Sequence, residues 1–225
     1  MRDRRLSWGA AVVLVATAVG VALLSRAMRL YPGGNVFDHH AAHHSFWLNF
    51  LCDLTGAQSA GGAPNPGSPS ARAAIVSLAI ALGAFWLILP SRIAARSRGA
   101  RGAGAVIRFA GALSALGLLA VPLADGAAHA IAVYAAAGPG LVASVTAFVA
   151  LVYGSRDVAL LLPASSAIAA GAIDSVLYAR RVLDHFVSCP PALPALQRVA
   201  GLLMLAWMAA TAWRVLRAPA AEGRL

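Results

Sequence analysis

Long apolar blocks separated by short polar stretches dominate the chain. Many of these blocks run for 18 residues or more with few charges, a length that predicts helices crossing a lipid bilayer. The predicted membrane spans are residues 8–24, 73–89, 106–123, 128–153, 158–178 and 196–216. We therefore expect residues 1–225 to form a single all-α membrane domain, an integral membrane bundle of six transmembrane helices.

The fourth span contains the sequence AGPG at residues 137–140. Proline and glycine kink helices, but both are tolerated inside membranes. A shorter span from Gly140 to Tyr153 is the alternative, and it has too few residues to cross a core of about 30 Å. We therefore expect the longer helix, with AGPG inside it.

The charged residues support a membrane protein. Only 12% of the chain is charged and 60% is hydrophobic, whereas soluble domains usually carry about 25% charged residues. The net charge of +10 comes from 18 basic residues, all of them arginine. Most lie between apolar blocks, where they set topology and meet anionic head groups, and no basic patch is interleaved with aromatic residues. We expect the lipid bilayer as partner and exclude nucleic acid; no motif identifies a protein partner.

The distribution of the arginines predicts an orientation. Six spans place both termini on one side of the membrane, and twelve of the 18 arginines lie on that side. The positive-inside rule then puts both termini in the cytoplasm of a bacterial inner membrane. The long polar segment 25–72, between the first two spans, becomes an outer loop.

Four of the six histidines lie in this outer loop: His39, His40, His43 and His44. If this piece is helical, it holds two pairs with a spacing of four residues, and such pairs can chelate zinc or another divalent metal. No glutamate follows as in a metalloprotease H-E-x-x-H motif. Solvated histidines in a loop are the alternative, and no other cofactor is predicted.

The second half of the loop has a helical pattern. Ser45 is suited to an N-cap, and Gly56 is suited to a helix end. Asn49 and Asp53 share one face at a spacing of four residues, and aromatic and aliphatic residues occupy another. These features predict a short interfacial helix in the first outer loop.

Two further polar features are predicted near the same side of the membrane. Asp125 and His129 have a helical spacing where the third and fourth spans meet, and a carboxylate there would orient the imidazole. A hydrogen bond that closes the loop is the alternative. Asp174 is a charge inside the fifth span, where ionisable groups are often functional. Its alternatives are snorkelling to the head groups or pairing with Arg180 or Arg181.

Together these residues form a predicted polar site at the outer face. Its members are Asn49, Asp53, Asp125, His129 and Asp174. Cys52 and Cys189 are also expected outside, where an oxidising periplasm favours a disulfide between them. Two reduced thiols are the alternative, because sequence does not provide the distance that a disulfide requires.

Three short motifs carry a resemblance to a known group. They are the YPGG turn, the NFLCDL run and the P-x-x-D…H step at the end of the third span. With six spans, they resemble bacterial membrane proteins of the DRAM/Frag/Sfk-like families. The matching residues are Tyr31, Pro32, Gly33, Gly34, Asn49, Phe50, Leu51, Cys52, Asp53, Leu54, Pro122, Asp125 and His129. The resemblance implies a six-helix fold and brings no established activity.

Two functions remain open from the sequence. The first is a non-enzymatic sensing, scaffolding or membrane-organising role. The alternative is a membrane-embedded, metal-dependent hydrolase acting on lipid, with Asp53, Asp125 and His129 as catalytic candidates. A weaker similarity to alkaline-ceramidase-type lipid amidases supplies no matching residue. A transporter is disfavoured, since the chain lacks visible repeats and has few charges within its spans.

Overall fold

Six long helices make up the computed structural model, which describes residues 4–93, 98–124, 126–154 and 158–217. No strand is present in these ranges. The helices are α1 (Arg4–Leu30), α2 (Ser68–Ile88), α3 (Arg98–Ala120), α4 (Gly126–Gly154), α5 (Leu161–Leu183) and α6 (Leu193–Arg217). All six are long and apolar enough to cross a membrane, so the prediction of an all-α, six-span fold is confirmed.

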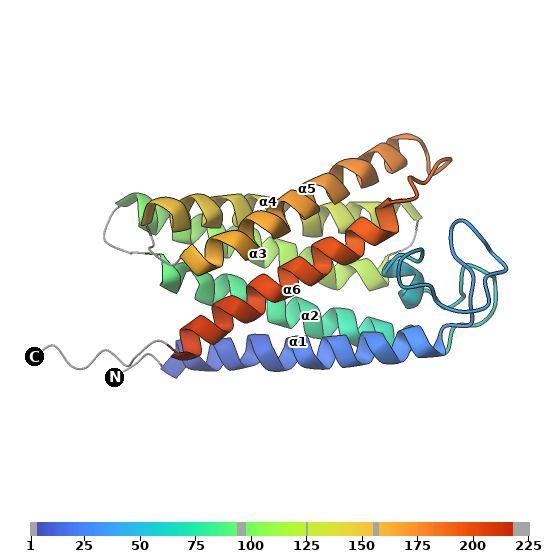
Figure 1. Cartoon of the computed structure of the whole chain (residues 1–225), viewed down its shortest axis with the longest axis horizontal. Coiled ribbons are helices and arrows are strands. Elements are labelled where there is room, and N and C mark those ends of the chain that lie inside the picture. The colour runs from blue at the N-terminus through green and yellow to red at the C-terminus, as the bar shows by residue number, and fades with distance from the viewer. Residues whose placement is uncertain (1–3, 94–97, 125, 155–157, 218–225) are drawn as a thin grey trace, which may run out of the picture.

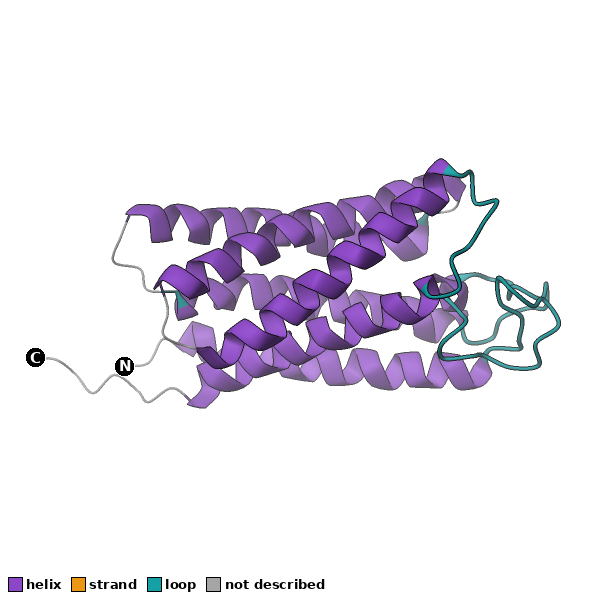
Figure 2. Ribbon diagram, turned by 45° about the horizontal axis from the view of Figure 1, so that its top comes forward, coloured by secondary structure: helices purple, strands orange, loops and turns teal. Residues whose placement is uncertain are grey.

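The helices run alternately up and down in one bundle, so α1 begins and α6 ends at the same end (Figure 1). Helix α1 packs against α2 and α6, α3 packs against α4, and α5 packs against α6. We call residues 31–67, between α1 and α2, the cap. Figure 2 shows its loops gathered at the opposite end of the bundle, which we call the cap end.

Helix α4 is continuous across the AGPG sequence, with Pro139 inside it. The longer fourth helix is therefore confirmed, and the shorter alternative is wrong. A neighbouring helix contributes a hydrogen bond close to the proline: Ser114 Oγ on α3 donates to the carbonyl of Ala136 at 2.7 Å. Support of this kind from adjacent helices allows proline inside membrane helices.

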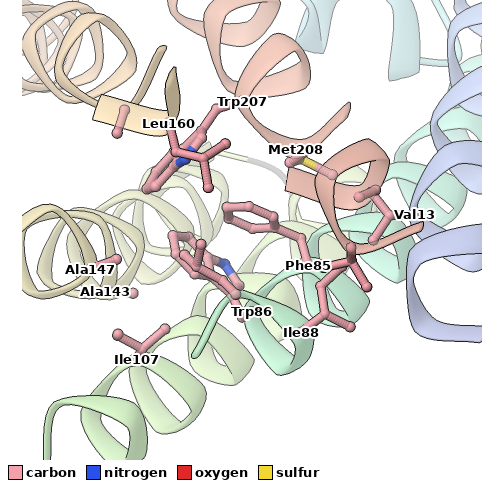
Figure 3. Packing of buried hydrophobic residues seen from close by; sticks show 14 of the residues in the cluster. Val13, Phe85, Trp86, Ile88, Ile107, Ala143, Ala147, Leu160, Trp207 and Met208 are labelled. Carbon is pink, nitrogen blue, oxygen red and sulfur yellow. The ribbon is translucent and has the colours of Figure 1, made fainter. Parts of the chain in front are cut away.

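An aromatic cluster lies in the interior of the bundle, toward the end opposite the cap (Figure 3). Phe85 and Trp86 on α2 meet Trp207 on α6, with ring centroids 5.1 Å and 5.9 Å from that of Trp207. The rings stand edge to face, the arrangement that their quadrupoles favour. Gly111 on α3 makes room for Trp86, since a Cβ there would lie 2.1 Å from the Trp86 side chain. The cluster thereby holds α2, α3 and α6 together.

Helices α3 and α4 approach closely through a small residue. A Cβ on Gly117 would lie 2.4 Å from the backbone of Ala135 and Ala136. Contacts of this kind between small residues are how membrane helices associate, because lipid offers no hydrophobic driving force between them.

The cap does not contain the predicted interfacial helix over residues 45–56. Residues 45–51 form turns, and only Cys52–Thr55 (η1) forms a short 3-10 helix. The prediction fails because side chains take up backbone groups that a helix would pair with one another. In particular, the carbonyls of Phe46 and Asn49 accept hydrogen bonds from α6.

Candidate functional site

Arg198 is the residue that joins the cap to the bundle. It lies in the second turn of α6 and is only 3% exposed. Its Nε donates to the carbonyl of Phe46, and its Nη2 donates to the carbonyl of Asn49, both at 3.0 Å. The same Nη2 lies 3.3 Å from His44 Nε2. One guanidinium group therefore holds three points of the cap.

These contacts replace the hydrogen bonds of a helix. In a helix, the amide of Phe50 would donate to the carbonyl of Phe46. Instead it donates to Asp53 Oδ2 at 2.8 Å. The amide of Leu51 donates to Gln197 Oε1 on α6 at 2.7 Å. Side chains thus compete successfully with the helical backbone pattern.

Asn49 is completely buried at the centre of the cap. Its Nδ2 donates to the carbonyl of Gly34 at 2.7 Å and to Asp53 Oδ2 at 3.1 Å. Its Oδ1 accepts from the amide of Ser45 at 2.9 Å. Asn49 and Asp53 therefore do lie together, although turns rather than a helix bring them into contact.

Asp53 is half-buried beside two guanidinium groups. Burial raises the pKa of its carboxyl above the ordinary value. Hydrogen bonds from Asn49 and Phe50 act in the opposite direction, as do the charges of Arg198 and Arg181. The carboxyl serves as an acceptor that fixes the turn, and the two arginines partly compensate its charge.

Arg181 approaches the cap from the last turns of α5. Its guanidinium lies over the ring of Phe50, with Cζ 4.7 Å from the ring centroid, and 5.5 Å from the ring centroid of Phe186. Guanidinium groups at this distance from aromatic rings form cation–π contacts. Helix α5 therefore contacts the cap through the aromatic residue next to Asn49.

The turn that starts the cap requires glycine. Gly33 and Gly34 have φ values of +131° and +83°, a region that other residues rarely adopt. A Cβ on Gly34 would also lie 2.2 Å from the amide nitrogen of Gly61. Close by, the hydroxyl of Tyr31 accepts from the amide of Ala60 at 2.9 Å. The two ends of the cap are thus packed against each other.

The four loop histidines have different surroundings. His39, His40 and His43 are exposed and lie in turns, so the helical spacing that would make them chelating pairs is missing. Among the described residues, no group of three or more His, Cys, Asp or Glu side chains could hold a metal ion. His44 is half-buried, and burial together with the charge of Arg198 lowers its pKa to about 4.

In the part of the chain that the structure describes, no hydrogen bond joins His129 or Asp174 to Asn49 or Asp53. His129, in the first turn of α4, has its Nδ1 3.2 Å from the carbonyl of Val121 and closes the turn between α3 and α4. Asp125, its predicted partner, lies outside the described residues. His129 therefore makes the loop-closing bond that was its alternative role, with a carbonyl as partner.

Asp174 faces a cavity within the bundle. The cavity has a volume of about 200 Å³ and is lined by residues of α2, α3, α4, α5 and α6, including Ser114, Ser144 and Ser175. The guanidinium of Arg181 lies over the rings of Phe50 and Phe186, and its Nε is buried without a hydrogen-bond partner. Asp174 is thus a polar group of the bundle interior, separate from the cap.

Cys52 and Cys189 are free thiols in the structure. Burial raises the pKa of the Cys52 thiol to about 12 and also raises the pKa of Cys189. Both thiols are therefore protonated at neutral pH, and neither is an activated nucleophile.

Sequence reasoning found Asn49 and Asp53 but missed Arg198 and Gln197. Arg198 counted only toward the topology, as one basic residue among 18. The sequence did contain a signal for Arg198. This residue stands inside an apolar span with no acidic residue on the same helix, and a charge in such a position indicates a functional site. Comparison of the chain with protein-family models, curated proteins and solved structures found no match.

Proposed function

We propose that the chain is a multi-pass protein of the bacterial inner membrane, with both termini in the cytoplasm and the cap in the periplasm. We propose a non-enzymatic role in which the cap and the bundle act as one sensing or scaffolding unit at the outer face. The observation that carries this proposal is the docking of the cap on Arg198. A loop fixed in this way transmits a change at the outer face to α6.

The hydrogen bonds of the polar residues favour binding over catalysis. Asp53 accepts from a backbone amide and from Asn49, and Asn49 also bonds two backbone groups of the cap. A general base must instead reach the proton that it removes from a substrate. These residues serve the shape of the cap, as positioning groups. Membership of the DRAM/Frag/Sfk-like group is part of the same proposal, supported by the six-helix fold.

A turnover assay tests the non-enzymatic role against the lipid hydrolase. Purified protein is incubated with zinc and inner-membrane phospholipids, and the products are measured by mass spectrometry. We expect no more lysolipid from the wild type than from Asp53→Asn, which keeps an oxygen to accept from Phe50. Hydrolysis that disappears in Asp53→Asn would overturn the proposal.

The orientation is tested with single cysteines in a chain whose native cysteines are replaced by serine. Ala63→Cys lies in the exposed part of the cap, and Gly102→Cys lies at the opposite end, where a Cβ has open space. A membrane-impermeant maleimide added to intact spheroplasts should label only Ala63→Cys. Labelling of Gly102→Cys alone would reverse the topology.

A further inference from the structure

An apolar groove of about 290 Å³ lies between α1, α2 and α6, just below the cap. Its floor includes the buried side chains of Leu24, Ile75 and Met208. Its rim includes Val21 and Leu202, which are 42% and 53% exposed. Because the rim is exposed on a membrane-spanning part of the bundle, the groove opens toward lipid.

The groove ends at the buried guanidinium of Arg198. The Nε and Nη2 atoms of this group are bonded to the cap, but Nη1 is buried without a hydrogen-bond partner. None of the hydrogen-bond acceptors of Arg198 is a carboxylate. Asp53 compensates part of this charge without accepting a hydrogen bond from Arg198, but a buried N–H that lacks an acceptor is still unfavourable. The outer end of the groove is therefore suited to an acidic group.

A second arginine lies near the same end. Ser25 on α1 lines the groove, and the exposed Arg29 follows it by four residues, on the same face of the helix. None of the described residues that line the groove is acidic. The mouth is thus positive and the interior apolar, which complements an amphiphile with an acidic head.

The length of the groove matches one leaflet of a bilayer. Along α6 it extends from Arg198 to Met208, which corresponds to about 15 Å at the helical rise per residue. The hydrocarbon core of a bilayer is about 30 Å thick, so one leaflet accounts for about half of that. Arg198 lies about 8 Å inside the start of α6, at the depth of the head-group and glycerol region.

We propose that this groove binds one acyl chain of an anionic phospholipid of the outer leaflet. The acyl chain lies along α6, and the negatively charged phosphate meets Arg198 and Arg29. The ring of Phe46, stacked 5.3 Å from the guanidinium of Arg198, forms the outer rim and moves aside for the phosphate. Because Arg198 also holds the cap, binding of the lipid at Arg198 affects the position of the cap. This inference rests on the proposed function.

The test is native mass spectrometry of the purified full chain with added phospholipid. The probes are dioleoyl phosphatidylglycerol, dioleoyl phosphatidylcholine and glycerol 3-phosphate. Gly201→Leu blocks the groove, because Gly201 lines it and has open space at its Cβ. Gly102→Leu is the matched control, with the same open space at the other end of the bundle. Arg29→Gln removes charge at the mouth without altering the cap.

We expect the wild type and Gly102→Leu to bind phosphatidylglycerol about tenfold more tightly than phosphatidylcholine, because both lipids offer a phosphate but only phosphatidylcholine brings a cation close to Arg29 and Arg198. Glycerol 3-phosphate should not compete. Gly201→Leu should lose about tenfold or more of the affinity, and Arg29→Gln should reduce the preference for phosphatidylglycerol.

Equal binding of the two lipids, or unchanged binding by Gly201→Leu and Arg29→Gln, would overturn the lipid site. Competition by glycerol 3-phosphate would reveal a simple anion site instead and would also overturn it. The same spectra test the proposed function separately. Intact phosphatidylglycerol is expected, and its conversion to the lyso form by the wild type would overturn the non-enzymatic role itself.

Discussion

The guanidinium of Arg198 fits its position because of its planar shape. Its Nε and Nη2 form one edge, and that edge meets two carbonyls of the cap at 3.0 Å each. Lysine carries a compact ammonium group that cannot present two parallel N–H groups in this way. The substitution of one basic residue by the other is therefore not conservative here.

We predict that Arg198→Lys loosens the cap while the six helices remain. Lysine can keep at most one of the two charge-assisted hydrogen bonds, so the free energy of unfolding should fall by about 1.5–3 kcal/mol. Hydrogen exchange of residues 31–67 should rise. Arg180→Lys, an exchange at an exposed arginine of α5, is the control. Unchanged cap protection in Arg198→Lys would contradict the prediction.

His44 makes the stability of the cap depend on pH. Its pKa is lowered from 6.5 to about 4 by burial and by Arg198, and the Tyr31 ring packs edge to face on it. Between these values the unfolded chain binds a proton that the folded chain does not, so stability falls as pH falls through this window. Below about pH 4 the stability that the neutral His44 contributes is completely lost.

We predict that the cap becomes more protease-sensitive between pH 6.5 and 5, and that His44→Gln reduces this change. His40→Gln, at an exposed position, should behave like the wild type. The difference between the wild type and His44→Gln isolates this group from Asp53, whose raised pKa acts in the opposite direction. If the protease sensitivity of the cap changed equally with pH in His44→Gln and His40→Gln, His44 would be excluded as the cause.

At the scale of elements, the helices were predictable and the cap was not. A span needs about 20 apolar residues and must satisfy its backbone internally, so its signal is local. The conformation of residues 45–51 depends instead on Gln197 and Arg198, which lie 146 and 149 positions from their partners Leu51 and Asn49. The pairing of Asn49 with Asp53 was predictable because turns also bring residues four apart together.

The contact between α3 and α4 offers a test at the same scale. We predict that Gly117→Ala lowers the free energy of unfolding by about 1–3 kcal/mol, because its Cβ would lie 2.4 Å from the backbone of Ala135. Gly102→Ala, where the Cβ meets open space, should be neutral or slightly stabilising. Thermal unfolding in detergent measures both. Equal stability of the two variants would contradict the close approach of the helices.

At the scale of the whole molecule, the cap end combines two features. The cap end carries ordered loops held by side chains of α5 and α6. The apolar groove begins directly beneath the cap. An occupant of the groove and the position of the cap therefore depend on the same arginine.

The tryptophans differ in their exposure, and their fluorescence can therefore be quenched selectively. Trp86 and Trp207 are completely enclosed in the bundle, whereas Trp47 on the cap is 52% exposed. Trp8 and Trp213, both exposed, lie toward the opposite end. A water-soluble quencher confined to the cap side of a sealed vesicle should therefore extinguish the fluorescence of Trp47 first. The natural protein thus carries an intrinsic reporter of cap movement and needs no added label.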